Sequence, residues 1–288
     1  MTEAAIRDAS TRDLEAIVAI AWADEAPGSG AHPSSAFRDY YDHLVRAERV
    51  TVAEVDGRVV GFGAAVDSGR SRHLADLFVL PDHQGDGLGR RLLDEVLADA
   101  LPRTTFASGD PRALPIYVRA GMTALWPNLY LAGDPRALPP PSPGYEVSPI
   151  SLDELAALEM SWTGADRSRE LAYWRRLPEP RPFGVARRGD LVAAGLVRGR
   201  IVGDGDWVNR ATVAPSAEPL PALLAALATA SGLAGAVGPI LGACVAGPSP
   251  LVRALLDAGY RVTDRDVFLA SDAAIVDPTR EIVNTGFL

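Results

Sequence analysis

The sequence has 288 residues, of which 48 % are hydrophobic and 23 % are charged, an ordinary globular composition that is long enough for two packed domains. Its formal net charge is −9, and its 28 basic residues are all arginines. This balance argues against an extended basic surface for nucleic acid and weakly favours a cationic substrate.

Targeting and redox signals are also weak. The start, MTEAAIRDAS, lacks the apolar core of a signal peptide. The longest apolar run, 220–241, is interrupted by glycine and proline, and this favours a buried helix and strand over a membrane span. The single cysteine, Cys244, excludes an intrachain disulfide and is expected in the core. We expect a cytoplasmic monomer or homodimer that binds neither nucleic acid nor membrane.

The first half of the sequence predicts a mixed α/β unit. The turn dipeptide Asp56-Gly57 between two alternating apolar runs predicts a β-hairpin. In chain order the pattern predicts strand 5–9, helix 11–24 capped by Ser10 or Thr11, helix 34–48, strands 49–55, 59–66 and 73–80, helix 88–100, strand 104–107, helix 112–120 and strand 125–131.

The second half repeats this order after a proline-rich segment. Residues 133–144, GDPRALPPPSPG, favour an extended linker. The domains predicted from this are 1–132 and 145–288. The second half then predicts strand 145–150, helices 152–162 and 168–177, strands 183–187, 191–199 and 206–213, helix 220–230, strand 240–246, helix 251–258 and strand 261–270. We interpret the repeated order as a divergent internal duplication.

The stretch 77–91, LFVLPDHQGDGLGRR, carries the strongest chemical signal. A strand ends at Pro81, and glycines at 85, 87 and 89 lead directly into an amphipathic helix. Such a turn presents unpaired backbone N–H groups at the positive end of a helix dipole, which suits a phosphate or pyrophosphate. The alternative is a tight strand-to-helix turn without a ligand. The dinucleotide fingerprint fits poorly, and the Gly-Lys-Ser/Thr of a P-loop is missing.

This stretch resembles the coenzyme-A-binding signature of the GNAT superfamily of N-acetyltransferases. That signature reads Gln/Arg-x-x-Gly-x-Gly/Ala after a strand ending in Val-x-Pro, and Gln84, Gly87 and Gly89 stand at its three positions. The family's Ala-x-x-x-Tyr-x-x-x-Gly-Phe signature is similar to residues 113–122, with Tyr117 at the tyrosine and Met122 replacing Phe. The resemblance covers about residues 4–132.

The resemblance implies a fold and a set of roles. The expected fold is α/β with two tandem GNAT-like domains, each a mostly antiparallel central sheet flanked by helices. The cosubstrate would be acetyl-CoA, with no metal, and the partner a small-molecule amine that attacks directly. Tyr117 would protonate the leaving thiolate and touch the cofactor, and the Val79 N–H would polarise the thioester carbonyl. Cofactor contacts are expected from Leu77, Phe78, Val79, Gln84, Gly85, Asp86, Gly87, Leu88, Gly89 and Arg90.

The general base is left open by the sequence. Asp76 is the first candidate, although it would equally suit orientation of the amine or capping of a loop, and His73 is the second. A chain of waters is a third route. Asp110 stands where many family members carry a CoA-contacting Asn, and this departure puts that contact in doubt. Aromatic side chains that could line a substrate pocket or belong to the core are Trp22, His32, Tyr40, Tyr41, Trp126 and Trp162.

The second half lacks the corresponding site. Alignment of Val213 with Val79 puts Glu218, Pro221 and Leu223 opposite Gln84, Gly87 and Gly89, and Leu255 opposite Tyr117. A proline removes a donor and a carboxylate repels phosphate. The favoured function is therefore an N-acetyltransferase with one site, in the first half. The alternatives are an acyl-CoA sensor without turnover, and an enzyme that acetylates protein N-termini or lysines.

Overall fold

The computed structural model describes residues 4–25, 32–99, 102–109, 111–199, 205–233 and 240–288. The first half contains β1 (Ala5–Asp8), η1 (Thr11–Asp13), α1 (Leu14–Glu25), α2 (Ser35–Ala47), β2 (Arg49–Val55), β3 (Arg58–Asp67), β4 (Arg72–Val79), η2 (Pro81–His83), α3 (Leu88–Val96), β5 (Arg103–Ala107), α4 (Ala113–Arg119), β6 (Thr123–Gly133) and η3 (Pro135–Ala137). The second contains β7 (Tyr145–Pro149), α5 (Leu152–Thr163), α6 (Ser168–Trp174), β8 (Arg181–Arg187), β9 (Asp190–Gly199), β10 (Asp206–Val213), α7 (Pro219–Leu233), β11 (Leu241–Ala246), α8 (Pro250–Asp257), β12 (Arg261–Ala270) and β13 (Glu281–Ile282).

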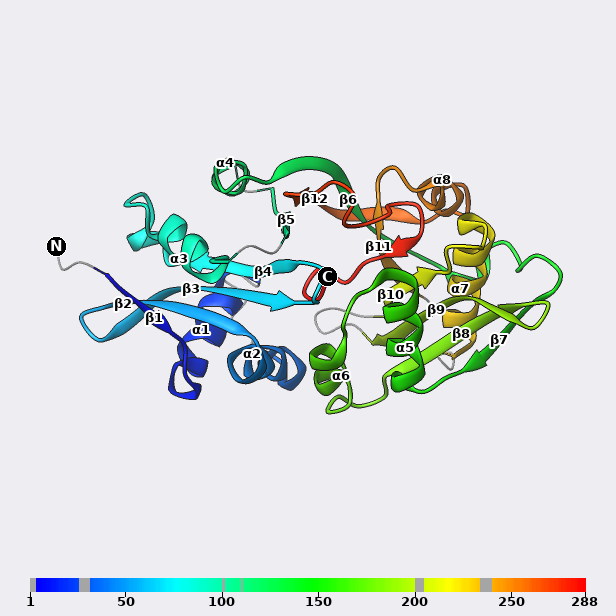
Figure 1. The fold of residues 1–288 in the computed structure, drawn as a ribbon, viewed down its shortest axis with the longest axis horizontal. Helices are drawn as coiled ribbons and strands as arrows, with labels where there is room; N and C mark the ends of the chain where they lie inside the picture. The colour runs from blue at the N-terminus through cyan, green and yellow to red at the C-terminus, as the bar shows by residue number, and fades with distance from the viewer. Residues whose placement is uncertain (1–3, 26–31, 100–101, 110, 200–204, 234–239) are drawn as a thin grey trace.

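The strands form one continuous sheet of 13 strands in the order β1-β2-β3-β4-β5-β12-β6-β11-β13-β10-β9-β8-β7. Neighbours pair antiparallel except β4 with β5, and β10 pairs in parallel with β11 over a short stretch. Helices flank the sheet (Figure 1). The predicted mixed α/β fold with a mostly antiparallel sheet is confirmed.

The two halves exchange strands at the middle of the sheet. β12, from the second half, pairs with β5 of the first, with Phe268 opposite Phe106. β6, from the first half, pairs with β11 of the second, with Tyr130 opposite Cys244. β6 and β12 also pair with each other and lie together between the two halves (Figure 1). Each half therefore depends on a strand from the other.

The sheet has a similar order from both edges: β1 to β5 from one side, and β7 to β10 and then β11 from the other, with β13 between β10 and β11. An irregularity in register also recurs, just before Asp76 on β4 and just before Arg210 on β10. Both features support the predicted internal duplication. The division at residues 133–144 stays a prediction, since the sheet continues through both halves.

The core follows the apolar patterning of the helices. α1, α2, α5 and α6 share one buried cluster, which spans both halves and includes Leu44, Phe62, Trp174 and Phe287. α7 and α8 pack against the second half of the sheet in another cluster. Capping side chains fix the helix starts: Ser34 Oγ accepts from the Phe37 N–H at 3.2 Å.

Some boundaries differ from those predicted. Ser10 begins a 3-10 turn, not the α-helix itself, and its N–H donates to the Asp13 carboxylate. α3 ends at Val96, four residues early, and the Arg72 guanidinium binds the Ala98 carbonyl and Asp99 just beyond this end. The predicted end, residue 100, lies outside the described residues. α7 extends from Pro219 to Leu233, α6 ends at Trp174, and β13 has no counterpart in the prediction.

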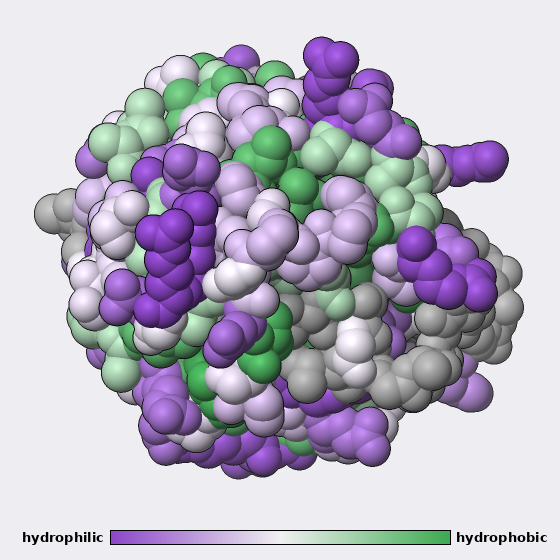
Figure 2. All heavy atoms as spheres, turned by 90° about the vertical axis from the view of Figure 1, so that its right-hand side faces the viewer, coloured by the Kyte–Doolittle hydropathy of each residue, from purple (hydrophilic) through white to green (hydrophobic). Residues whose placement is uncertain are grey.

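The surface of the second half mixes hydrophilic and hydrophobic side chains on the face in Figure 2. In the part of the chain that the structure describes, no helix combines the length and apolar character needed to cross a membrane.

Candidate active site

The glycine loop forms an open turn at the start of α3. Gly85 and Gly87 have φ values of 99° and 76°, which side chains other than glycine rarely adopt, and Gly87 is the N-cap residue of α3. A Cβ at either position would meet open space, so their glycines serve backbone conformation and not packing. Leu88 is buried and anchors the helix beneath the loop. The first amides of α3, like those of any α-helix, lack an intrahelical partner at this turn.

Gln84 ties this loop to its surroundings. Its Nε2 donates to the Val79 carbonyl at 2.7 Å, and its Oε1 accepts from the Arg112 guanidinium at the start of α4. The single glutamine of the chain therefore connects the end of β4, the glycine loop and the helix that carries Tyr117.

β4 and β5 separate beside this loop. Their parallel pairing runs from Arg72 opposite Arg103 to Leu74 opposite Thr105 and goes no further. The remainder of β4, from Ala75 to Val79, pairs with β3 alone among the described strands. A gap therefore opens along one edge of residues 75–79, where the sequence predicts backbone pairing with a ligand.

The Val79 N–H points toward this gap. The next residue, Leu80, donates its N–H to Val60 of β3 at 2.9 Å, and hydrogen-bonding direction alternates along an antiparallel strand. The second half repeats this geometry: Ala214 donates to Val192 at 2.9 Å, and Val213 donates in the opposite direction, to the Arg280 carbonyl at 3.0 Å. Val213 thus illustrates how an N–H at this register meets a carbonyl oxygen.

A basic cleft of about 660 Å³ lies between β4, the glycine loop and α4. Its described lining includes three arginines, Arg90, Arg112 and Arg119, and no carboxylate. Of the predicted cofactor contacts, those that line it are Leu77, Val79, Gln84, Gly85, Gly87, Leu88, Gly89, Arg90 and Tyr117. Asp86 is exposed outside the lining, and Phe78 faces the opposite side and packs against Phe62 at 5.5 Å between ring centroids.

An acidic cavity of about 550 Å³ lies on the other side of β4, where the two halves meet. Five carboxylates line it and, among the described residues, no arginine or histidine does: they are Asp24, Glu25, Asp76, Asp264 and Asp266. Its aromatic wall includes Tyr40 and Tyr41, for which the sequence left pocket and core open, together with Tyr130, Tyr173, Trp174 and Trp207. Trp22, His32, Trp126 and Trp162 are not part of the lining.

The basic cleft and the acidic cavity share two residues, Leu77 and Tyr117. Tyr117 lies on α4 and is buried, with 7 % of its surface exposed. It packs in the cluster that contains Leu74, Leu93 and Leu269, and this packing fixes the ring at the junction. A group bound in one cavity would therefore meet a group bound in the other at the Tyr117 side chain.

Asp76 borders the acidic cavity, where burial changes the pKa of its carboxyl. Burial raises the pKa of its carboxyl to about 7; hydrogen bonds from Tyr40 and Tyr41 oppose this shift, and the charges of Glu25 and Asp24 reinforce it. The Tyr40 hydroxyl donates to Asp76 Oδ2 at 3.2 Å. A pKa near neutrality suits proton transfer at physiological pH.

His73 has a different environment. Its Nδ1 lies 3.0 Å from Thr104 Oγ1 and its Nε2 lies 2.8 Å from the Thr285 carbonyl, so both ring nitrogens are engaged. The side chain is fully buried, and burial lowers its pKa to about 4. His73 therefore holds the segment 283–287 against β4 instead of reaching the cavity.

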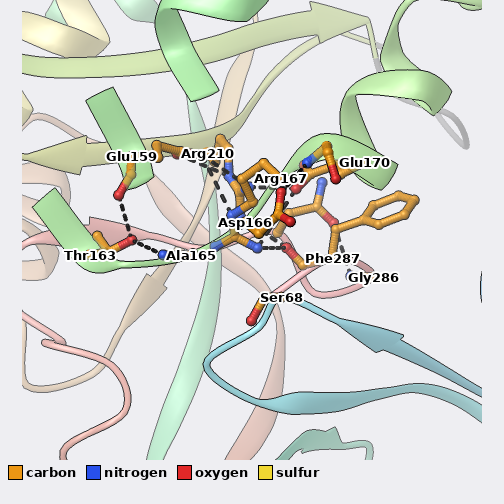
Figure 3. Close-up of polar contacts among 12 residues, drawn as sticks. Ser68, Glu159, Thr163, Ala165, Asp166, Arg167, Glu170, Arg210, Gly286 and Phe287 are labelled. Carbon is orange, nitrogen blue, oxygen red and sulfur yellow. Dashed lines mark hydrogen bonds and ion pairs between the residues drawn. The ribbon is translucent and has the colours of Figure 1, made fainter. Parts of the chain in front are cut away.

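The segment 283–287 forms part of the cavity wall and is fixed by a buried ionic cluster. Arg167 and Arg210 both donate to the Phe287 carbonyl, at 3.3 and 2.9 Å (Figure 3). Arg210 also pairs with Glu170 at 2.5 Å and with Glu159 at 3.3 Å. Because all four ionic side chains are at least nine-tenths buried, these pairs hold the segment in one position.

Several lining residues escaped the sequence prediction. Asp264, Asp266 and the segment 283–287 are nearly 200 residues from Asp76 and reach it through the strand exchange, so no local pattern could reveal them. Cys244 is buried, as predicted, but also borders the acidic cavity. Asp110 lies outside the described residues. Among the residues the structure describes, no group of His, Cys, Asp and Glu side chains is arranged to hold a metal.

Comparison with known proteins places this geometry in a family context. Residues 22–133 match the family model for the acetyltransferase (GNAT) domain. An uncharacterized N-acetyltransferase of Archaeoglobus fulgidus is 33 % identical over 75 residues, which are 23 % of this chain and 51 % of that protein. The chain thus spans about half the length of this curated relative.

Solved structures resemble the whole chain. A proposed acetyltransferase from Pyrococcus horikoshii superposes with a TM-score of 0.73 at 16 % identity, covering 100 % of this chain and 95 % of that one. A tandem GNAT protein from the clavulanic acid biosynthesis pathway gives a TM-score of 0.61 at 18 % identity, covering 96 % and 100 %. At these identities the likeness concerns the fold. Residues 22–133 are therefore similar to a GNAT acetyltransferase domain, and known structures share the fold of the chain along its full length.

Proposed function

We propose that this chain is an N-acetyltransferase that moves an acetyl group from acetyl-CoA to the primary amine of a small molecule, by direct attack. The observation that carries the proposal is the meeting of the basic cleft and the acidic cavity at Leu77 and Tyr117. An anionic cosubstrate suits the first and a cationic amine the second, and the GNAT domain match over residues 22–133 supports the same assignment.

The cofactor site is assigned to the basic cleft. The backbone amides of residues 84–89 would bind the pyrophosphate, as at other glycine-rich helix starts. Arg90, Arg112 and Arg119 line the same cleft and would add positive charge. The free edge of residues 77–79 would pair with the pantetheine arm, and its shape fits because β5 has separated from β4 there.

Acetyl-CoA supplies the acetyl group as a thioester. The Val79 N–H would donate to the thioester carbonyl oxygen, where negative charge develops. Asp76 would accept the proton that the attacking amine loses, directly or through a water, and Tyr117 would donate a proton to the departing sulfur. One C–N bond then replaces one C–S bond. Asp76 releases the accepted proton to solvent, and Tyr117 takes up a proton from solvent.

The two halves are proposed to be tandem GNAT-like domains of which only the first retains this site. The tandem arrangement of a structural neighbour of the same length supports it. The second half would serve as the far wall of the acceptor cavity, to which it contributes Tyr173, Trp174, Trp207, Asp264 and Asp266.

The direct test is release of free thiol from acetyl-CoA in the presence of a panel of small amines, with mass spectrometry of the acetylated product. We expect transfer to primary amines and a ratio of one thiol released to one amide formed. Acetyl-CoA binding without any transfer would instead support a sensor, and transfer only to peptides would redirect the proposal to protein acetylation.

A further inference from the structure

The acidic cavity has carboxylates at two separate positions, and the proposed reaction uses only one of them. Asp76 belongs to β4 of the first half. Asp264 and Asp266 belong to β12 of the second half and, two residues apart on one strand, face the same side of the sheet. Both positions border the same cavity.

We propose that the acceptor is a dication, such as a short diamine or polyamine, whose reacting amine lies at Asp76 while its second ammonium group is bound by Asp264 and Asp266. This inference rests on the proposed acetyl transfer and specifies its substrate class. Asp264 and Asp266 are thereby specificity-determining residues contributed by the second half.

Each β12 carboxylate accepts one hydrogen bond from the protein. Asp264 is exposed, and its Oδ1 accepts from the Arg265 N–H at 2.7 Å. The Tyr130 hydroxyl donates to Asp266 Oδ2 at 2.6 Å and fixes the partly buried carboxylate. The chain contains 28 arginines, yet none of the described ones borders this cavity. Within the part of the chain that the structure describes, neither Asp264 nor Asp266 forms an ion pair. An ammonium group from a ligand would supply that missing positive charge.

Asn209 adds a second, uncharged acceptor to this wall. Its side chain is 92 % buried and borders the cavity, and its Nδ2 donates to the Trp207 carbonyl at 3.1 Å. This leaves its Oδ1 with no hydrogen-bond partner among the described residues. An acceptor oxygen in the wall of the same cavity suits an ammonium group, which is a donor only.

The spacing fits a short molecule. β5 lies between β4 and β12 in the sheet, so two interstrand distances of about 4.8 Å separate the strands, at least about 10 Å in total where β4 and β5 diverge. Carboxylates that reach inward from both strands would span a molecule of a few methylene groups. The aromatic side chains of Tyr40, Tyr130 and Trp207 cover the walls between them.

The test compares diamines with matched monoamines: putrescine against butylamine, and cadaverine against pentylamine. We expect kcat/KM for the diamine to exceed that for its monoamine by about 10- to 100-fold, the range for a hydrogen bond to a charged group. In Asp266→Asn, which retains an acceptor for Tyr130, this ratio should fall toward one, mainly through the KM of the diamine. Asp190→Asn, at the exposed start of β9, is the matched control and should keep the ratio.

The outcomes separate the two proposals. Transfer with equal kcat/KM for diamines and monoamines would overturn the dication and leave the acetyltransferase intact. If no amine is acetylated, the proposed acetyltransferase activity is refuted. Calorimetry with putrescine alone then tests the proposed dication site. Putrescine binding that Asp266→Asn abolishes would support the dication site, whereas no binding to the wild-type protein would overturn it.

Discussion

The gap beside β4 and the gap beside β10 are built alike, but one is open and the other is filled. In both, the parallel pairing covers three residues and then stops, at Leu74 and at Val208. In the second half β13 enters the gap and pairs with both β10 and β11 through Ile282. A segment of the chain itself thus takes the position that we assign to a cofactor in the first half.

The residue that follows the register irregularity also differs between the two halves: it borders a cavity in the first half and is buried in the second. In the first half it is Asp76, which borders a cavity. In the second half it is Arg210, which is neutralised by Glu159 and Glu170 in a buried cluster. α7 also begins at Pro219, so helix replaces the open glycine loop. Under the duplication that we propose, internal contacts in the second half take the place of the ligand contacts of the first, and the fold would persist without a functional site.

Tyr117 provides the strongest test of this difference, since Leu255 stands at its position in the second half. Tyr117→Phe should lower kcat by about 100- to 10,000-fold, the usual value of general acid–base assistance, at nearly constant acetyl-CoA affinity. Steady-state kinetics and calorimetry measure the two quantities. Tyr260→Phe, a buried tyrosine of the second half, is the control. Unchanged turnover would assign Tyr117 to the core, and an equal loss of affinity would make it a binding residue.

The glycine loop offers the next test. Gly89→Glu, or Gly87→Glu, adds a carboxylate where we expect the pyrophosphate, and should weaken acetyl-CoA binding by at least about 100-fold, or roughly 2.8 kcal/mol, while the fold persists. Gly89 suits this experiment because its φ is not in the left-handed region and a Cβ there meets only Val79 Cγ2 at 3.8 Å. Gly232→Glu, at an exposed helical glycine of the second half, should bind normally. Normal binding by Gly89→Glu would refute the assigned loop.

If Asp76 is the general base, kcat/KM should depend on pH in a way that Arg210, the residue at the equivalent position of the second half, could not produce. Because its pKa is raised to about 7 and only the ionised form accepts a proton, kcat/KM should rise about tenfold per pH unit below 7 and level off above it. This profile is measured with a test amine whose own pKa lies well below 7, so that deprotonation of the amine adds nothing to the limb. Asp76→Asn should lose this limb and most of the activity. An unchanged profile would transfer the role of base to water.

The ionisation of Asp76 should affect stability in the direction opposite to its effect on activity: stability should fall as the pH rises. Its pKa in the folded state exceeds the ordinary value of 3.8, so its proton stabilises the fold at low pH, and this contribution is lost as pH rises toward 7. Asp76→Asn avoids the loss, and its Tm should gain on the wild type between pH 4 and 8. A Tm difference independent of pH would contradict the raised pKa.

A substitution in β13, which fills the gap of the second half, should have the smallest effect on acetyl-CoA binding. Ile282 is 1 % exposed, so Ile282→Ala should cost about 2–5 kcal/mol of unfolding free energy. We still expect one acetyl-CoA per chain, because the second half lacks the glycine loop as well. Ile240→Ala, at an exposed isoleucine, is the control for stability. Calorimetry showing two equivalent sites, in the variant or in the wild type, would break the comparison.

The sequence predicted the features that depend on neighbouring residues in the chain. Glycines at 85 and 87 marked positive φ, and the motif around Tyr117 placed that ring beside the loop because both signatures flank β5. The exchange of β6 and β12 could not be predicted, since either partner strand satisfies the same alternating pattern. For that reason the sequence also missed Asp264, Asp266 and the segment 283–287. β13 is only two residues long and carries no periodicity.

The exchanged strands also set the order in which the protein can fold during synthesis. β5 is followed by β6 in the chain, yet its neighbour in the sheet is β12, which the ribosome makes about 150 residues later. Until then the nascent first half presents an unpaired strand edge, a template for wrong pairing. Closing the middle of the sheet joins segments far apart in sequence and is therefore expected to be the slow step. We therefore expect substitutions that weaken the pairing of β12 to raise chaperone dependence and to lower the expression yield. Substitutions in the glycine loop or in the two cavities should have smaller effects on both.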